Sequence, residues 1–483
     1  MSNLKKMTLG LVLVTNLSGV GSSRDLDPVS FGRLGAQRCV WTSPEWNRLA
    51  TGLANVGIAN GPQRLILEYH GDFINSNALI FASSRGNLAD VKRLIELGIR
   101  INLKNNHGKT ALTYALTKGH IDIVRYLVDK GADVHLTIAS QVTSLVTAAN
   151  QGHLDVAKYL IEKATDFEIG QLNTVLVEAV SYQTLDLAGY LIDKGADVNS
   201  SMCDDTVLIA CIKGCNFDPA TRIEKTIALI KYLIEERGAD INLKNLAGET
   251  PLICATKNGN LDIIKLLIEN KADPNLPSAG GRVALMEASR RGDIDIVKYL
   301  IENKSNVDFQ DNRGRTALMF AAPEFAIDVV KYLVEKGTKV DLRDAYGQTA
   351  LMYAAKAGAI ENLKFLIVSG ANINLLSDLG QTALILAAKN CHVDAVKCLV
   401  ENGANVNLQD SEGKTALVNA CFEYAHILGK PFYTFKERTG CEDIIKCLAM
   451  NGADGNLKCH TGETALTFLS SKGYKHLVRL LTV

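Results

Sequence analysis

The sequence has no net charge, no catalytic signature and, beyond its first residues, no long hydrophobic run. Its 52 basic side chains balance 52 acidic ones, which argues against a protein whose main task is to bind nucleic acid or an acidic membrane surface. No later uncharged stretch approaches the roughly 20 residues that a membrane span requires. Glycine-rich phosphate loops, Gly-x-Ser-x-Gly elbows and His-Glu-x-x-His pairs are also absent. We therefore expect no enzyme, no cofactor, no nucleic-acid partner and no membrane span.

The eleven cysteines are scattered rather than set at the spacings of a small disulfide-stapled domain. Cys211 stands where other copies of the repeat described below have alanine, and Cys398 and Cys447 stand where other copies have a buried tyrosine. We expect free thiols in a reducing, cytoplasmic compartment. One group of cysteine and histidine residues resembles a metal site, but it lacks a Cys-x-x-Cys pair, so we expect no zinc site. Its members are Cys441, Cys447, Cys459 and His460.

Residues 1–72 contain no copy of the repeat and are expected to form a leader and cap. Lys5 and Lys6 precede a short apolar stretch, and small residues follow up to Ser22, which is the outline of a secretion signal over residues 1–22. An uncleaved leader is the other interpretation, so secretion is the alternative to a cytoplasmic location. We expect Trp41 and Trp46 to cover the first repeat.

A motif recurs along the rest of the chain with a period of about 33 residues. One copy reads Gly108-Lys-Thr-Ala-Leu, then Gly119-His-Ile-Asp-Ile-Val, then Gly131-Ala-Asp-Val-His. Such a period indicates a stacked solenoid, in which each unit buries its apolar faces only against its neighbours. We count twelve copies, the first of them degenerate. They are anchored at Asn77, Thr110, Thr143, Thr174, Thr206, Thr250, Val283, Thr316, Thr349, Thr382, Thr415 and Thr464.

Each copy predicts a pair of helices. In the second copy Thr110 is the expected N-cap of a short inner helix, which Gly119 ends. An outer helix is expected over residues 121–129, where the apolar residues form one stripe, and Gly131 ends it. Ala115 recurs as alanine in nine other copies. A residue kept this small predicts that neighbouring inner helices approach closely, so that a larger side chain would clash.

By these motifs the chain resembles the ankyrin repeat family over residues 73–483. The family's Thr-Pro-Leu-His-x-Ala appears as Thr250-Pro-Leu-Ile-Cys-Ala255 and, with alanine for proline, as Thr316-Ala-Leu-Met-Phe-Ala321. The resemblance implies an all-α, ankyrin-type helix-turn-helix solenoid with hairpin-like loops and about twelve repeats. The family's histidine after leucine is absent from every copy, so the hydrogen bond that it makes with the threonine must be replaced or lost.

The resemblance also implies a function. Ankyrin-like arrays act as scaffolds for protein–protein interaction, and they bind a partner through a concave face made of hairpin tips and inner helices. An exported ankyrin-repeat factor that engages host proteins is the alternative, and an accessory array of an enzyme is a less favoured one. Three residues match the family's Gly-His position, and we interpret them as structural loop histidines. They are His120, His153 and His392.

Polar helix residues fall into two groups. On the outer helices, acidic and basic residues three or four apart, such as Asp328 and Lys331, are expected to pair on the solvent face. On the inner helices, Glu178, Glu287 and Asn419 replace aromatic residues of other copies, and these positions are expected to open toward the concave face.

The period lengthens twice, near residues 213–226 and 423–440, between an inner and an outer helix. The second insertion holds Phe432 and Tyr433 among basic residues, and aromatic and basic side chains on a loop suit a contact site. Packing of the inserted aromatic side chains onto the adjacent repeat is the alternative.

The partner-binding site is predicted on the seventh and eighth repeats, where basic residues gather at hairpin tips and inner-helix ends. We take Arg282 and Arg315 to lack an acidic partner at helical spacing, so that pairing within the chain does not explain them. The planar arginine side chain suits carboxylates and is frequent at interfaces, so an acidic segment of a partner protein is the expected ligand. A solvated face without a ligand is the alternative. The predicted set is Arg282, Arg290, Arg291, Arg313 and Arg315, with Lys257, Tyr346 and Lys356 from flanking copies.

Overall fold

The computed structural model describes residues 71–105, 107–133, 142–163, 169–202, 204–214, 219–324, 326–428 and 435–482. The signal-like segment, Trp41, Trp46, Phe432 and Tyr433 lie outside the described residues. Contacts divide the chain into two units, residues 1–165 and residues 166–483, and each unit is described by itself.

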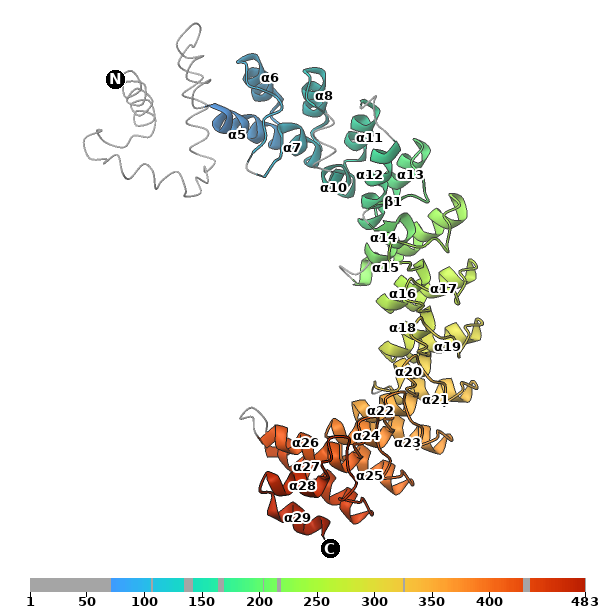
Figure 1. Ribbon diagram of the computed structural model, residues 1–483. Coiled ribbons are helices and arrows are strands. Elements are labelled where there is room, and N and C mark those ends of the chain that lie inside the picture. The colour runs from blue at the N-terminus through green and yellow to red at the C-terminus, as the bar shows by residue number, and fades with distance from the viewer. Residues whose placement is uncertain are drawn as a thin grey trace, which may run out of the picture. The chain divides into compact units, whose positions relative to one another are not determined.

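The described residues form twelve helix pairs, as the sequence predicted, and each pair is an inner helix followed by an outer helix (Figure 1). The first unit holds α5 (Gly71–Ser84) and α6 (Leu88–Glu96), α7 (Ala111–Thr117) and α8 (Ile121–Asp129), and α10 (Val142–Asn150) and α11 (Leu154–Lys163). The second unit begins with α12 (Ile169–Ser181) and α13 (Leu185–Asp193), α14 (Val207–Lys213) and α15 (Pro219–Lys231), α16 (Pro251–Asn258) and α17 (Leu261–Glu269), and α18 (Ala284–Arg291) and α19 (Ile294–Glu302). It continues with α20 (Ala317–Ala321) and α21 (Ile327–Glu335), α22 (Ala350–Ala357) and α23 (Ile360–Val368), α24 (Ala383–Lys389) and α25 (Val393–Glu401), α26 (Ala416–Leu428) and α27 (Phe435–Met450), and α28 (Ala465–Ser471) and α29 (Lys475–Leu481).

Threonine caps most inner helices, because its hydroxyl accepts a backbone N–H that the first helical turn leaves unpaired. The capping residues are Thr110, Thr206, Thr250, Thr316, Thr349, Thr382, Thr415 and Thr464. In the third and fourth copies the anchor threonines, Thr143 and Thr174, lie inside α10 and α12 and not at the N-cap. The Thr174 hydroxyl instead donates to the carbonyl of Gly170 at 2.9 Å. Val283 caps α18 without a side-chain bond.

The hydrogen bond of the missing family histidine is replaced in two repeats. Thr113 and Thr467 stand at its position, and each hydroxyl accepts from the backbone N–H of the capping threonine, at 3.2 and 2.8 Å. In other repeats an apolar side chain is buried there, for example Ile253 at 1% exposure and Met319 at 2%. Those repeats lose the bond and gain buried apolar surface instead.

The alanine of the inner helix is buried in every repeat that has it, with at most 3% of its surface exposed. Cys211, which replaces it in the fifth repeat, is fully buried. The predicted close approach of neighbouring inner helices is therefore confirmed. The residues are Ala82, Ala115, Ala148, Ala179, Ala255, Ala288, Ala321, Ala354, Ala387 and Ala420.

The loop histidines hold successive repeats together. His120 lies against Gly86 of the preceding repeat, where an added Cβ would come within 2.8 Å of the ring, and its Nε2 is 3.2 Å from the carbonyl oxygen of Ser84. His392 meets Gly358 in the same way, with the carbonyl of Lys356 at 3.0 Å. These glycines have positive φ, so both backbone conformation and space favour glycine there.

The hairpin loops are joined by polar bonds. In the fifth repeat, β1 (Ser201–Met202) and β2 (Asp205–Thr206) pair in antiparallel fashion. At the tips, a backbone amide donates to a carbonyl of the preceding repeat, as from Ala345 to Arg313 at 2.7 Å and from Asp378 to Tyr346 at 2.9 Å. In the same loops, Asn or Asp side chains accept the amide of the next repeat at 2.7–3.1 Å. They belong to Asn102, Asn199, Asn242, Asn275, Asp308, Asp341, Asn374 and Asn407.

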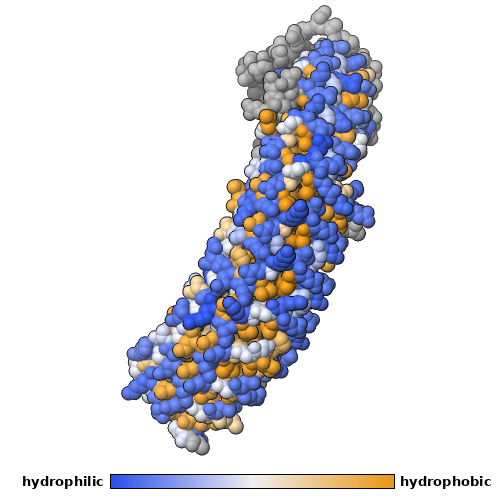
Figure 2. All heavy atoms as spheres, turned by 90° about the vertical axis from the view of Figure 1, so that its right-hand side faces the viewer, coloured by the Kyte–Doolittle hydropathy of each residue, from blue (hydrophilic) through white to orange (hydrophobic). Residues whose placement is uncertain are grey.

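Basic residues of the outer helices lie over aromatic rings of the next repeat. The cation of Arg125 is 5.2 Å from the ring centre of Tyr159, and that of Lys298 is 5.9 Å from Tyr332. Such contacts each stabilise by roughly 0.5–1 kcal/mol at exposed sites. The pair predicted between Asp328 and Lys331 is not among the ion pairs of the described residues. Figure 2 shows this side of the molecule, where hydrophilic side chains cover most of the surface and apolar ones lie between them.

The two insertions largely lengthen helices. In the fifth repeat, α15 continues into a π-helical turn, Tyr232–Glu236. In the eleventh repeat, α26 and α27 extend toward each other and leave residues 429–434 outside the described part of the chain.

We expect Ala321→Leu to destabilise the chain by about 1–3 kcal/mol, because a larger side chain overpacks a fully buried contact. Lys331→Ala, on the exposed side of α21, should cost less than about 0.5 kcal/mol. Urea unfolding of the two variants checks the helix register. Equal losses of stability would contradict it.

Candidate functional site

The five predicted arginines lie in repeats seven and eight, on the hairpins and on inner helix α18, within the second unit (Figure 1). Lys257 lies in repeat six, and Tyr346 and Lys356 lie in repeat nine. One group lies in the hairpins before the inner helices and consists of Arg282, Arg313, Arg315 and Tyr346. The other lies in the last turns of the inner helices and consists of Lys257, Arg290, Arg291 and Lys356. The hairpin tips of repeats eight and nine are neighbours, because the amide of Ala345 donates to the carbonyl of Arg313. Arg313 is exposed, and Tyr346 is 57% exposed.

Glu287 does not open to the surface as predicted. It is 2% exposed, and its carboxylate lies between two arginines of the same repeat. Arg282 Nη1 is 3.1 Å from one oxygen, and Arg290 Nε is 3.2 Å from the other. Since a buried carboxylate needs such partners, both arginines serve the fold of the seventh repeat.

Arg315 is also paired, and the expectation that it lacks an acidic partner was wrong. Asp311, four residues earlier, lies in the same hairpin and is buried. Its Oδ2 accepts from Arg315 Nε at 3.0 Å and Nη2 at 2.8 Å, while its Oδ1 accepts backbone amides of the loop. The guanidinium groups of Arg282 and Arg315 lie 5.7 and 4.6 Å from the ring centre of Phe320. The hairpins are thus tied to the first turns of the inner helices.

Arg291 takes the place of a loop histidine. Its guanidinium lies against Gly259, and its Nη1 donates to the carbonyl of Lys257 at 2.9 Å. That carbonyl corresponds to the Lys356 carbonyl that faces His392 in a later repeat. Lys257 itself pairs with Glu249. The sequence did not indicate that Arg291 replaces a histidine, because the two stand at different positions of the repeat. Arg291 precedes Gly292, whereas His120 follows Gly119.

Three predicted residues remain exposed. Among the described residues, the side chains of Arg313, Tyr346 and Lys356 have no ion pair or hydrogen bond. Leu379, at the next hairpin tip, is 56% exposed and was missed by the sequence analysis, which considered charge there. The amide of Asp378 donates to the Tyr346 carbonyl at 2.9 Å, so Leu379 follows Tyr346 along the row of tips. Phe432 and Tyr433 lie outside the described residues.

Asn419 and Glu178 are the other two polar inner-helix residues that were expected to open toward the concave face. Asn419 is 7% exposed, and its amide donates to the carbonyl of Thr415 at 3.0 Å, so it does not open to the surface. Glu178 is partly buried in α12, and burial raises the pKa of its carboxyl group.

The prediction that all cysteines are free thiols was wrong for one pair. Cys391 and Cys441 form a disulfide. Burial raises the pKa values of the Cys254 and Cys421 thiols to about 12, which keeps them protonated and unreactive near neutral pH. Cys447, expected to point inward, is only partly buried. Within the described residues no group of His, Cys, Asp or Glu side chains suits a metal ion.

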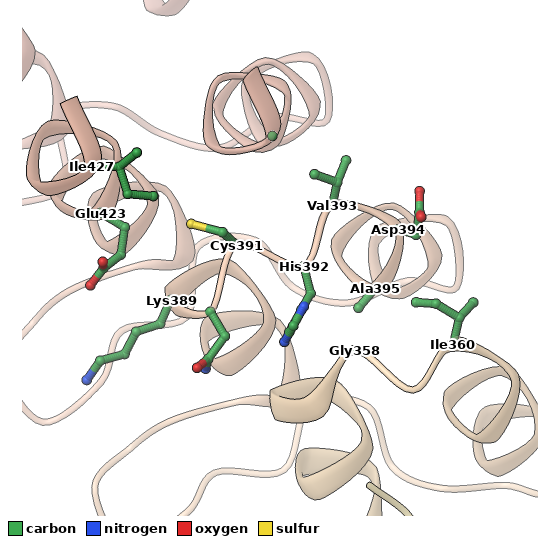
Figure 3. A pocket seen from close by; sticks show the side chains of 12 residues that line it. Gly358, Ile360, Lys389, Cys391, His392, Val393, Asp394, Ala395, Glu423 and Ile427 are labelled. Carbon is green, nitrogen blue, oxygen red and sulfur yellow. The ribbon is translucent and has the colours of Figure 1, made fainter. Parts of the chain in front are cut away.

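An open cavity of about 480 Å³ lies at the turns between the helices of repeats nine to eleven (Figure 3). Lys389, His392 and Glu423 line it, together with one of the disulfide cysteines, Cys391. The His392 ring is held by its contacts with Gly358 and with the carbonyl of Lys356 in the preceding repeat. Among the described helices, none combines the length and the apolar character that crossing a membrane requires.

We expect Arg282→Ala together with Arg290→Ala to destabilise the chain by about 3 kcal/mol, because Glu287 would remain buried without a charged partner. Arg313→Ala should change stability by less than about 0.5 kcal/mol. Thermal unfolding of both variants checks this. A double variant as stable as the parent would show that Glu287 does not depend on the two arginines.

A comparison with curated proteins gave no match. A comparison with protein-family models matched the model of ankyrin repeats (3 copies) at residues 58–138, 138–202, 220–311, 285–377 and 351–428. These matches cover most of the chain and follow the helix pairs described above. Ankyrin repeats are generally modules for protein–protein interaction, and proteins built from them are typically non-catalytic. The chain belongs to the ankyrin repeat family.

Proposed function

We propose that the chain is a non-catalytic scaffold that binds a partner protein through the hairpin tips and inner-helix ends of repeats eight to ten. The observation that carries this proposal is the row of tips at Arg313, Tyr346 and Leu379. Their positions are held by backbone hydrogen bonds, while their side chains are exposed. Side chains that the fold does not use are available to a ligand.

We propose that the partner presents an acidic segment with an apolar residue. Arg313 and Lys356 supply positive charge without an internal partner among the described residues, and Arg282 and Arg290 share a single carboxylate. Tyr346, in the same repeat as Lys356, and Leu379, at the tip of the next repeat, add exposed apolar surface. An arginine can bind a carboxylate through two parallel hydrogen bonds, and tyrosine and arginine are enriched among residues that dominate interfaces.

We expect Arg313→Glu with Lys356→Glu to weaken binding of an acidic peptide at least about tenfold, because two attractive contacts become repulsive. The peptides are selected by phage display on the full chain, and Kd is measured by fluorescence anisotropy. Arg290, Arg291 and Arg315 are left intact because they hold the fold.

The matched control is Lys331→Glu with Lys397→Glu, which makes the same charge change on the outer helices and should leave Kd unchanged. Replacing the peptide's Glu and Asp by Gln and Asn should also abolish the effect of the site variant. Undiminished binding by the folded site variant, or selected peptides without acidic residues, would contradict the proposed site.

A second candidate is an exported factor that engages host proteins, and the disulfide favours it. Disulfides persist in oxidising environments and are rare in the cytosol. If the protein is exported through residues 1–22, intact-mass analysis of the mature chain should give a start near Ser22 and a mass that includes the Cys391–Cys441 bond. A mature chain that begins at Met1 inside cells would favour the cytoplasmic scaffold.

A further inference from the structure

The interface between repeats ten and eleven lacks the contact of histidine with glycine. Cys391 immediately precedes His392, as Gly119 precedes His120, so it occupies the glycine position of repeat ten. Cys441 lies two residues before Asp443, as His392 lies two residues before Asp394, so it occupies the histidine position of repeat eleven. The two residues that would meet as glycine and histidine are therefore both cysteine.

The backbone keeps the geometry of the contact that was replaced. Cys391 has a φ of 57°, in the left-handed region where the equivalent Gly358 has 71°. This conformation disfavours residues with a Cβ atom. The Cα atoms of Cys391 and Cys441 are 5.4 Å apart, and their disulfide joins the turn of repeat ten to helix α27 of repeat eleven. A covalent bond thus stands where repeats nine and ten use the His392 ring against Gly358.

A second inter-repeat contact is also altered here. On the outer helices of other repeats, a cation lies over the tyrosine of the next repeat, as Lys298 does over Tyr332. Cys398 and Cys447 replace that tyrosine in repeats ten and eleven. The loop bond between these two repeats remains, because the amide of Asn405 donates to the side-chain oxygen of Asn374 at 2.8 Å. The interface therefore keeps its polar hairpin contact but depends on the disulfide at the helix turns.

One cysteine of the bond lines a cavity, and the other is buried. Cys391 is partly buried and lines the open cavity of about 480 Å³, where its sulfur lies among the side chains shown in Figure 3. Cys441 is fully buried. A small thiol in the cavity would therefore reach the sulfur of Cys391 first.

We propose that Cys391 and Cys441 form a reversible thiol–disulfide switch that controls how firmly repeats eleven and twelve are held to the preceding repeats. A thiolate of a dithiol reductant attacks Cys391 Sγ, forms a mixed disulfide and releases the Cys441 thiolate, which takes up a proton. The second thiol of the reductant then displaces Cys391, which is released as a thiol while the reductant becomes a disulfide. Exchange with a disulfide oxidant reverses the two-electron reaction.

After reduction, Cys391 still has the unfavourable left-handed backbone conformation, but the covalent bond no longer compensates for it. Helix α27 then has neither a disulfide nor a histidine at this interface. In a repeat array each unit contacts only its neighbours, so the loss is confined to units beyond the altered interface. Reduction therefore loosens α27, α28 and α29 and does not change the central repeats.

Hydrogen–deuterium exchange of the full chain, with and without dithiothreitol, tests the switch. We expect reduction to speed amide exchange in α27–α29 at least about tenfold and to leave α16–α23 unchanged. Peptide mapping under non-reducing conditions identifies the linkage. The matched variant, Cys391→Gly with Cys441→His, restores the pair found at Gly358 and His392 and should exchange slowly with or without reductant.

The single variant Cys441→Ser should exchange as the reduced parent does under both conditions, and it serves if the double variant fails to fold. Three results would each overturn the proposal. They are an oxidised chain without the Cys391–Cys441 linkage, exchange in α27–α29 that is unchanged after the linkage is cleaved, and a Cys441→Ser variant as protected as the oxidised parent.

Discussion

The close approach of neighbouring inner helices is the contact on which the rest of the structure depends. It requires a residue of alanine size at one position, and that alanine is buried in every repeat that has it. Once the inner helices lie this close, the glycine at the end of one helix meets the histidine or arginine of the next repeat. The hairpin tips also come within hydrogen-bonding distance of each other. The apolar helix faces, which a single repeat cannot bury, become a continuous core.

Buried carboxylates decide how the arginine cluster is interpreted. Glu287 and Asp311 are almost fully inaccessible, and three arginines surround them. A buried carboxylate is stable only with charged or hydrogen-bonding partners, so Glu287 and Asp311 can be buried only because these arginines pair with them. Positive charge that looks like a binding surface in the sequence is therefore largely structural. The basic residues that remain as candidates for recognition are those that no buried group requires.

The repeat pattern predicted the helix pairs and the buried alanine, because both follow from spacing within one copy. It failed where contacts depend on loop geometry. Arg315 and Asp311 are four residues apart but meet within a hairpin rather than on a helix. Arg282 reaches Glu287, five residues later, from a hairpin onto a helix, which helical spacing does not describe. The Cys391–Cys441 bond spans 50 residues and two repeats. It could have been anticipated only by aligning each copy's glycine with the next copy's histidine.

The row of hairpin tips shows why one array can keep its fold while its surface changes. Each tip is held by a backbone amide and a backbone carbonyl, so the fold places no demand on the side chain there. Successive tips accordingly carry Arg313, Tyr346, Leu379 and Glu412, which share no chemistry. The contacts at the helix turns behave differently, because there the side chain itself is the contact. A cysteine pair can replace glycine and histidine at one such interface without disturbing the others, since each interface is shared by only two repeats.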